Sequence, residues 1–160
     1  MAILLHPDFQ DFLKLLNSHK VDYLIIGGYS VGFHGYPRTT ADIDIWIAQN
    51  PSNAEKMVLV LQDFGFNVHE LCPEIFLRQD KIIRMGNAPV RIKILTGISG
   101  VSFDDCYRNK TSAVIDGVRV NIISLDDLKK NKKASGREKN LDDLKNLPKV
   151  FVINRIPFSF

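Results

Sequence analysis

The sequence predicts one α/β (α+β) domain, because helical and strand periodicities both occur along its 160 residues. Residues 7–19 place four apolar side chains on one helical stripe. Residues 41–48 alternate polar and apolar side chains, as a strand does. The apolar runs 113–115 and 118–123 flank Asp-Gly, a strong signal for a β-hairpin. A chain of this length can bury a good-sized core, so we expect residues 1–160 to form a single domain.

The first half of the chain contains clear boundary signals. Pro7 suits the first turn of the initial helix. Ser52 and Glu55 have the spacing of a capping box, which predicts where a later helix begins. The elements expected after the first helix are a strand at 21–26, a short helix at 29–34, a strand at 41–48, and a helix from the capping box to near Gly65.

The second half is predicted to hold two hairpins and more helices. Residues 66–80 give no clear pattern. Ser102 and Ser124 stand where N-cap residues are preferred. The elements expected are a hairpin over 81–95, a short helix over 102–109, a hairpin over 113–123, a C-terminal helical pair over 124–147 that ends before Pro148, and an apolar tail at 150–160 that packs on the domain or on another subunit.

Asp42 and Asp44 are the first candidate functional residues. They flank Ile43 in a predicted strand, so both carboxylates point to one face of the sheet. Like charges side by side repel each other, and folding alone does not require them there. A hard divalent cation such as Mg²⁺ prefers oxygen ligands, which indicates a metal site.

Gly27 and Gly28 are the second candidate. They end the predicted strand at 21–26 and precede a short helix. Glycine lets a backbone approach a phosphate closely. Together with Asp42 and Asp44, the glycines predict a metal–nucleotide site.

These residues carry a resemblance to a known family. Gly27-Gly28, a gap, and then Asp42-Ile43-Asp44 resembles the signature of the DNA polymerase β-like nucleotidyltransferase superfamily. The segment from Arg38 to Ala41 resembles its small bacterial members, which include lincosamide-modifying enzymes and components of phage-defence and toxin–antitoxin systems. The resemblance covers residues 21–147.

The resemblance implies a nucleotidyltransferase fold with a mixed β-sheet flanked by helices. It also implies transfer of a nucleoside monophosphate from a nucleoside triphosphate, with ATP as the expected donor, to a hydroxyl. In this pattern Gly27, Gly28 and Ser30 seat the triphosphate, and Asp42 and Asp44 hold Mg²⁺.

One position departs from the family pattern. The third carboxylate of the family corresponds to Lys93, within the run from Arg91 to Thr96. An ammonium about 4 Å from a divalent ion costs several kcal/mol at an effective dielectric constant of about 20. Lys93 therefore either impairs metal binding or contacts a phosphate directly. Acidic residues that could replace the third carboxylate in space are Glu74, Asp80, Asp104 and Asp105.

The C-terminal helices supply two further candidates by resemblance. Small bacterial relatives carry a Lys, an Arg and then Lys-Asp, and the matching residues here are Lys132, Arg137, Lys139 and Asn140. Lys132 shares a helical stripe with Leu125 and Leu128, so we expect it to point to the core side. Lys132 and Arg137, with Arg38, are predicted to face the nucleotide. The neighbouring lysines are expected to lie on a solvated face.

Composition sets the outer limits. The formal net charge of +3 permits an anionic ligand without requiring nucleic acid. No apolar run is long enough to span a membrane, and residues 1–12 lack the basic and apolar regions of a signal peptide. Cys72 and Cys106 lack metal-type spacing, which favours free thiols and a reducing cytoplasm.

Two functions from different classes follow. The first is a Mg²⁺-dependent nucleotidyltransferase, impaired by Lys93, whose acceptor is open among an antibiotic, a tRNA end and a protein hydroxyl. The alternative is a catalytically inactive module of the same fold that binds a nucleotide or a protein partner, as in a toxin–antitoxin pair, or a second copy of itself. A nucleic-acid-binding protein is a third reading, supported only by the lysines of 129–139.

Overall fold

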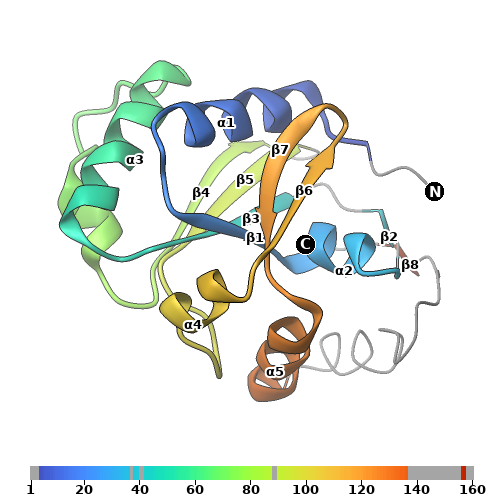
Figure 1. The fold of residues 1–160 in the computed structure, drawn as a ribbon. Coiled ribbons are helices and arrows are strands. Elements are labelled where there is room, and N and C mark those ends of the chain that lie inside the picture. The colour runs from blue at the N-terminus through green and yellow to red at the C-terminus, as the bar shows by residue number, and fades with distance from the viewer. Residues whose placement is uncertain (1–3, 37, 40–41, 88–89, 137–155, 158–160) are drawn as a thin grey trace.

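The computed structural model describes residues 4–36, 38–39, 42–87, 90–136 and 156–157. A mixed sheet of six strands in the order β4-β5-β3-β1-β7-β6 forms its centre (Figure 1). β3 pairs in parallel with β5 and β1 in parallel with β7, whereas the other neighbours are antiparallel. The strands are β1 (Tyr23–Ile26), β3 (Asp42–Ile47), β4 (Ile82–Asn87), β5 (Val90–Leu95), β6 (Thr111–Ile115) and β7 (Val118–Ile122).

Helices cover both faces of this sheet. α1 and α3 lie on one face, and α4 and α5 lie on the other (Figure 1). The α1 side holds the larger core, in which Ile43, Ile45 and Ile47 of β3 pack among apolar side chains of the two helices. The helices are α1 (Pro7–Ser18), α2 (Gly27–Phe33), α3 (Pro51–Asp63), α4 (Phe103–Arg108) and α5 (Leu125–Ser135), with a 3₁₀ turn η1 (Pro73–Leu77).

A second apolar cluster lies on the opposite face. Trp46 of β3, which alternates with the isoleucines, packs there with Leu24 and Ile26 of β1 and with Leu128 of α5. Because side chains of a strand alternate between faces, Asp42 and Asp44 lie on the Trp46 side. The larger core therefore holds β3 in place while its two carboxylates face the other way.

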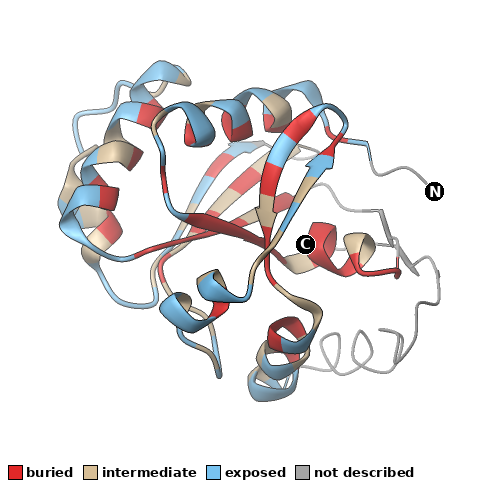
Figure 2. Cartoon of the chain, in the orientation of Figure 1, coloured by how far each residue is buried: buried red, intermediate tan, exposed pale blue. Residues whose placement is uncertain are grey.

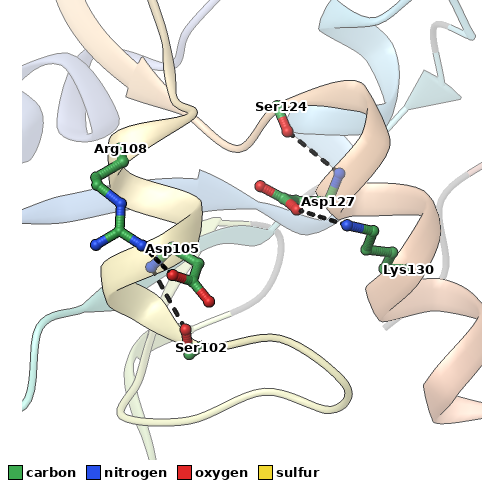
Figure 3. Close-up of polar contacts among 6 residues, drawn as sticks. All are labelled: Ser102, Asp105, Arg108, Ser124, Asp127 and Lys130. Carbon is green, nitrogen blue, oxygen red and sulfur yellow. Dashed lines mark hydrogen bonds and ion pairs between the residues drawn. The ribbon is translucent and has the colours of Figure 1, made fainter.

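The predicted starts of α1, α4 and α5 are confirmed, and that of α3 is wrong. α1 begins at Pro7, as predicted. Ser102 caps α4 and Ser124 caps α5, each accepting a hydrogen bond from the backbone N–H three residues later (Figure 3). The capping box at Ser52 is wrong. Asn50 is the N-cap of α3, with its side-chain oxygen 2.9 Å from the backbone nitrogen of Asn53. Pro51 then occupies the first helical position, which its fixed φ favours.

Both predicted hairpins are present, as β4–β5 and β6–β7. The second turns at Asp116 and Gly117, whose φ values of 51° and 81° are the left-handed conformations that a tight hairpin turn requires. Residues 66–80, which gave no pattern, contain η1.

Only part of the predicted C-terminal structure falls on described residues. The first helix of the predicted pair is α5, whereas the second, with Arg137 and residues 138–147, lies outside the described residues. Of the apolar tail, Ile156–Pro157 forms β8, which pairs in parallel with β2 (Arg38–Thr39). Both cysteines are free thiols. Within the described part of the chain, no helix is long and apolar enough to cross a bilayer.

Candidate active site

Two carboxylates stand side by side on β3, as predicted. Asp42 and Asp44 are two residues apart in the strand and thus share a face. In the antiparallel pairing with β1, Asp44 lies opposite Ile26, the residue directly before Gly27. The carboxylates therefore lie on the strand next to the one that leads into Gly27. Gly27 and Gly28 are the first two residues of α2, whereas the sequence predicted that they precede the helix.

Gly27 lies in direct contact with Asp44. Its φ is +69°, and a Cβ added there would lie 2.9 Å from Asp44 Cγ and closer still to Oδ2. Any side chain would therefore collide with the carboxylate, and the left-handed φ would add strain. The structure thus explains the glycine by the close approach of backbone and carboxylate.

Ser30 lies inside the first turn of α2. The residue is fully buried, and its hydroxyl donates a hydrogen bond to the Gly27 carbonyl oxygen at 2.7 Å. This bond holds the backbone of Gly27 against Asp44. Contact of Gly27, Gly28 and Ser30 with a triphosphate stays a prediction.

Two other polar side chains, one in α2 and one directly after it, have structural roles. Burial raises the pKa of Tyr29 to about 12, so its hydroxyl stays protonated at neutral pH, and its ring meets Phe9 edge-on. His34, the residue directly after α2, is buried, with Nε2 2.7 Å from the Ile123 carbonyl oxygen. Burial lowers the pKa of His34, which favours the neutral ring.

Asp42 is held by two cations of β5. Its side chain is fully buried, with Oδ1 3.2 Å from Arg91 Nε and Oδ2 2.9 Å from Lys93 Nζ. The parallel register explains this arrangement, since Asp42 lies opposite Arg91 and Asp44 lies opposite Lys93. Arg91 was not predicted as a site residue. The signal for it was its spacing of two residues from Lys93, which places both side chains on the face of the carboxylates.

Lys93 occupies the third-carboxylate position on the same face as Asp42 and Asp44. Its ammonium pairs with Asp42, diagonally across the two strands, while its own register partner is Asp44. Among the residues that the structure describes, no three His, Cys, Asp or Glu side chains gather into a metal-binding group. The proposed substitutes Glu74, Asp80, Asp104 and Asp105 therefore do not complete a three-carboxylate set.

Of the three cations predicted to face the nucleotide, only Lys132 has a side chain within the described residues. Lys132 lies on α5 with only 4% of its surface exposed, so the predicted core-side orientation is confirmed. Arg38 belongs to β2, which leads into the site segment, but its side chain is outside the described part. Arg137 is outside it altogether. Contact of these three residues with a nucleotide stays a prediction.

The donor set suits one hard cation rather than two. Asp42 and Asp44 offer carboxylate oxygens on a common face, which is the chemistry that Mg²⁺ prefers. Both oxygens of Asp42 already lie within ion-pair distance of a cationic side chain. A second divalent ion would need further anionic ligands, and the ammonium of Lys93 stands at the position of the missing one.

The family and the fold are established by comparison with known proteins. The model of the family described as "Nucleotidyl transferase of unknown function (DUF2204)" matches residues 6–157. The fold is similar to that of a provisionally assigned nucleotidyltransferase from Thermotoga maritima, with a TM-score of 0.59 and 18% identity over 89% of this chain and 94% of that chain.

A second solved structure gives the same result. The lincosamide antibiotic adenylyltransferase LnuA, bound to lincomycin, aligns with a TM-score of 0.58 and 18% identity, over 92% of this chain and 98% of that chain. At this identity the likeness concerns the fold alone, and it confirms the predicted α/β nucleotidyltransferase fold. A search of curated proteins finds no match.

Proposed function

The chain belongs to this family of nucleotidyl transferases, and on that premise we propose that it transfers a nucleoside monophosphate from a nucleoside triphosphate to a hydroxyl. ATP is the expected donor. The observation that supports this proposal is the contact of Gly27 with Asp44, beside Asp42 on the same strand face. Glycine at this position brings the backbone at the start of α2 directly beside the carboxylate pair, and such a backbone can approach a phosphate closely.

The proposed reaction breaks a phosphoanhydride bond of the nucleoside triphosphate and forms a phosphoester bond to the acceptor. The acceptor oxygen forms a bond to the α-phosphorus, and the bond from that phosphorus to the pyrophosphate oxygen breaks. Pyrophosphate leaves, and the hydroxyl proton passes to solvent. A Mg²⁺ ion held by Asp42 and Asp44 would supply charge stabilisation at the phosphates. Gly27, Gly28 and Ser30 would seat the triphosphate, and Arg38, Lys132 and Arg137 would balance its charge.

Lys93 is proposed to slow this reaction. Its ammonium lies 2.9 Å from Asp42 Oδ2, so part of the negative charge that would attract a metal is already balanced. A lysine in place of a carboxylate changes the local charge by two units, which opposes a divalent cation by several kcal/mol at an effective dielectric constant of about 20. We therefore expect Mg²⁺ to bind weakly alone and better together with a nucleotide that brings its own oxygens.

The same ion pair favours a second candidate function. A module whose carboxylate is neutralised by Lys93 and Arg91 could bind a nucleotide or a protein partner without turnover, as a toxin–antitoxin component would. The preserved contact of Gly27 with Asp44 supports transfer instead, because a module without chemistry does not need it. The free thiols of Cys72 and Cys106 agree with a cytoplasmic setting.

A transfer assay separates the two functions. Wild-type protein with α-labelled ATP, Mg²⁺ and a panel of hydroxyl acceptors is expected to give slow incorporation of label. Asp44→Asn should reduce it on the order of 100-fold, because a charge-stabilising ligand is lost at the phosphates. Asp105→Asn is the matched control, since that exposed carboxylate pairs with Arg108 within α4 (Figure 3) and does not join Asp42 and Asp44 in a metal-binding group.

Unaltered incorporation in Asp44→Asn would remove Asp44 from the mechanism. If the wild type binds ATP but incorporates no label into any acceptor, the binding-module function replaces transfer.

A further inference from the structure

A row of charged side chains crosses the sheet from the carboxylates to its edge. Asp44 of β3 lies opposite Lys93 of β5, and Lys93 lies opposite Arg84 of β4. Paired residues of neighbouring strands point to the same face, and adjacent strands lie about 4.8 Å apart. One carboxylate is thus followed by two cations in a line that ends on the edge strand β4.

The outer end of this row is open to solvent. Arg84 is exposed, and its neighbour on the same strand face, Ile82, is 41% exposed. The ribbon of β4 shows exposed as well as buried segments (Figure 2). The apolar cluster on this face is built from other elements, mainly β1, α2, α4 and α5. Among the residues that the structure describes, Arg84 has no ion-pair partner, whereas Lys93 pairs with Asp42.

Positive charge is concentrated on this hairpin and on the segment that leads into it. Residues 78–93 contain five Lys or Arg and one Asp, while the whole chain has a formal net charge of only +3. The net positive charge of this segment exceeds the net charge of the entire protein, so the rest of the chain is close to neutral. The cations of this segment are Arg78, Lys81, Arg84, Arg91 and Lys93.

From this arrangement we infer that the acceptor carries phosphate groups and lies over β5 and β4, with Arg84 as its main phosphate contact. The inference rests on the proposed function and names its acceptor class. Gly27 follows β1, on one side of β3, and β5 lies on the other. A triphosphate seated at the glycines leaves the β5 side of Asp44 for the acceptor hydroxyl.

The chemistry of the row suits a phosphate-bearing acceptor better than a neutral one. The guanidinium of an arginine matches a phosphate with two parallel hydrogen bonds. Lys93, between Arg84 and the carboxylates, adds a point charge next to the reacting hydroxyl. A neutral acceptor would supply no negative charge to pair with the guanidinium of Arg84. In this account Arg84 determines acceptor specificity and does not touch the donor nucleotide.

Binding of two phosphate-bearing probes tests the inference. They are a short single-stranded RNA with a free 3′-hydroxyl and ribose 5-phosphate, with ribose as the uncharged match for the latter. At least one phosphate probe is expected to bind the wild type, and Arg84→Glu should weaken that binding on the order of tenfold. For RNA, the slope of log affinity against log salt should fall by about 1.

Arg119→Glu is the matched control. Arg119 is exposed on β7, beyond β1 in the strand order and away from the row, so its reversal should change probe binding by less than about twofold. Preferential binding of RNA identifies a polynucleotide acceptor, and preferential binding of ribose 5-phosphate identifies a small phosphorylated one.

The inference is overturned if neither phosphate probe binds, or if the two charge reversals weaken binding equally. An ATP titration of the same proteins separates this failure from failure of the proposed function. ATP binding without probe binding contradicts the acceptor class alone, whereas loss of both contradicts the nucleotide site as well. Weaker ATP binding in Arg84→Glu would assign the cation to the donor nucleotide instead.

Discussion

Replacing Gly27 with alanine is expected to reduce the free energy of unfolding by about 3 kcal/mol and to weaken ATP binding strongly. The new Cβ would stand 2.9 Å from Asp44 Cγ and closer to its Oδ2, so either the carboxylate or the end of β1 must move. The backbone also has a left-handed φ of +69°, which alanine adopts at a cost. Urea denaturation and calorimetric titration with ATP measure the two effects.

Gly117→Ala is the matched control for this substitution. Gly117 also has a left-handed φ, of +81°, but among the described residues no atom beyond the glycine and its chain neighbours lies within 4 Å of the position of its Cβ. It should lose only about 1 kcal/mol from backbone strain and bind ATP normally. If the two variants lose equal stability and both bind ATP, the contact of Gly27 with Asp44 has no role in the site.

Replacing Lys93 with aspartate is expected to raise the affinity for Mg²⁺ by about tenfold or more and to increase nucleotide transfer. The substitution removes the ammonium that lies 2.9 Å from Asp42 and adds a third carboxylate opposite Asp44. Arg91 still pairs with Asp42, so the buried carboxylate keeps one counter-charge. Mg²⁺ titration and label incorporation from α-labelled ATP provide the measurements.

Lys93→Gln separates the two parts of this effect. It removes the positive charge without adding a metal ligand, so Mg²⁺ affinity should lie between those of the wild type and Lys93→Asp. Brisk turnover by the wild type together with slower turnover by Lys93→Asp would place Lys93 in the mechanism, in contact with a phosphate.

The local features of the site could be predicted from the sequence because they depend on neighbouring residues. The alternation of Asp42 with Ile43 is enough to place the carboxylates away from the larger core. The Asp116-Gly117 turn likewise specifies its hairpin through the conformations that those two residues tolerate.

Features that depend on distant pairing could not be predicted from local patterns. That Lys93 would face the carboxylates followed only from its place in the family pattern. Its ion pair with Asp42 depends on the parallel register of β3 and β5, which no local pattern encodes. The exposed row ending at Arg84 depends on the same register and on β4 being an edge strand. The prediction of where α3 begins was wrong for a different reason. Asn50 and Ser52 are both good N-cap residues, and Pro51, which favours the first helical position, makes Asn50 the cap.

Calorimetric titration of the Asp42→Asn variant with ATP tests whether Asp42 and Asp44 form a metal–nucleotide site. Circular dichroism should first establish that this variant is folded, because the substitution leaves Arg91 and Lys93 facing a neutral amide. We expect wild-type protein to bind Mg²⁺ weakly alone and to bind ATP more tightly when Mg²⁺ is present. The Mg²⁺-dependent gain should disappear in Asp42→Asn. If that variant binds ATP and Mg²⁺ as the wild type does, the carboxylate pair is not the metal site.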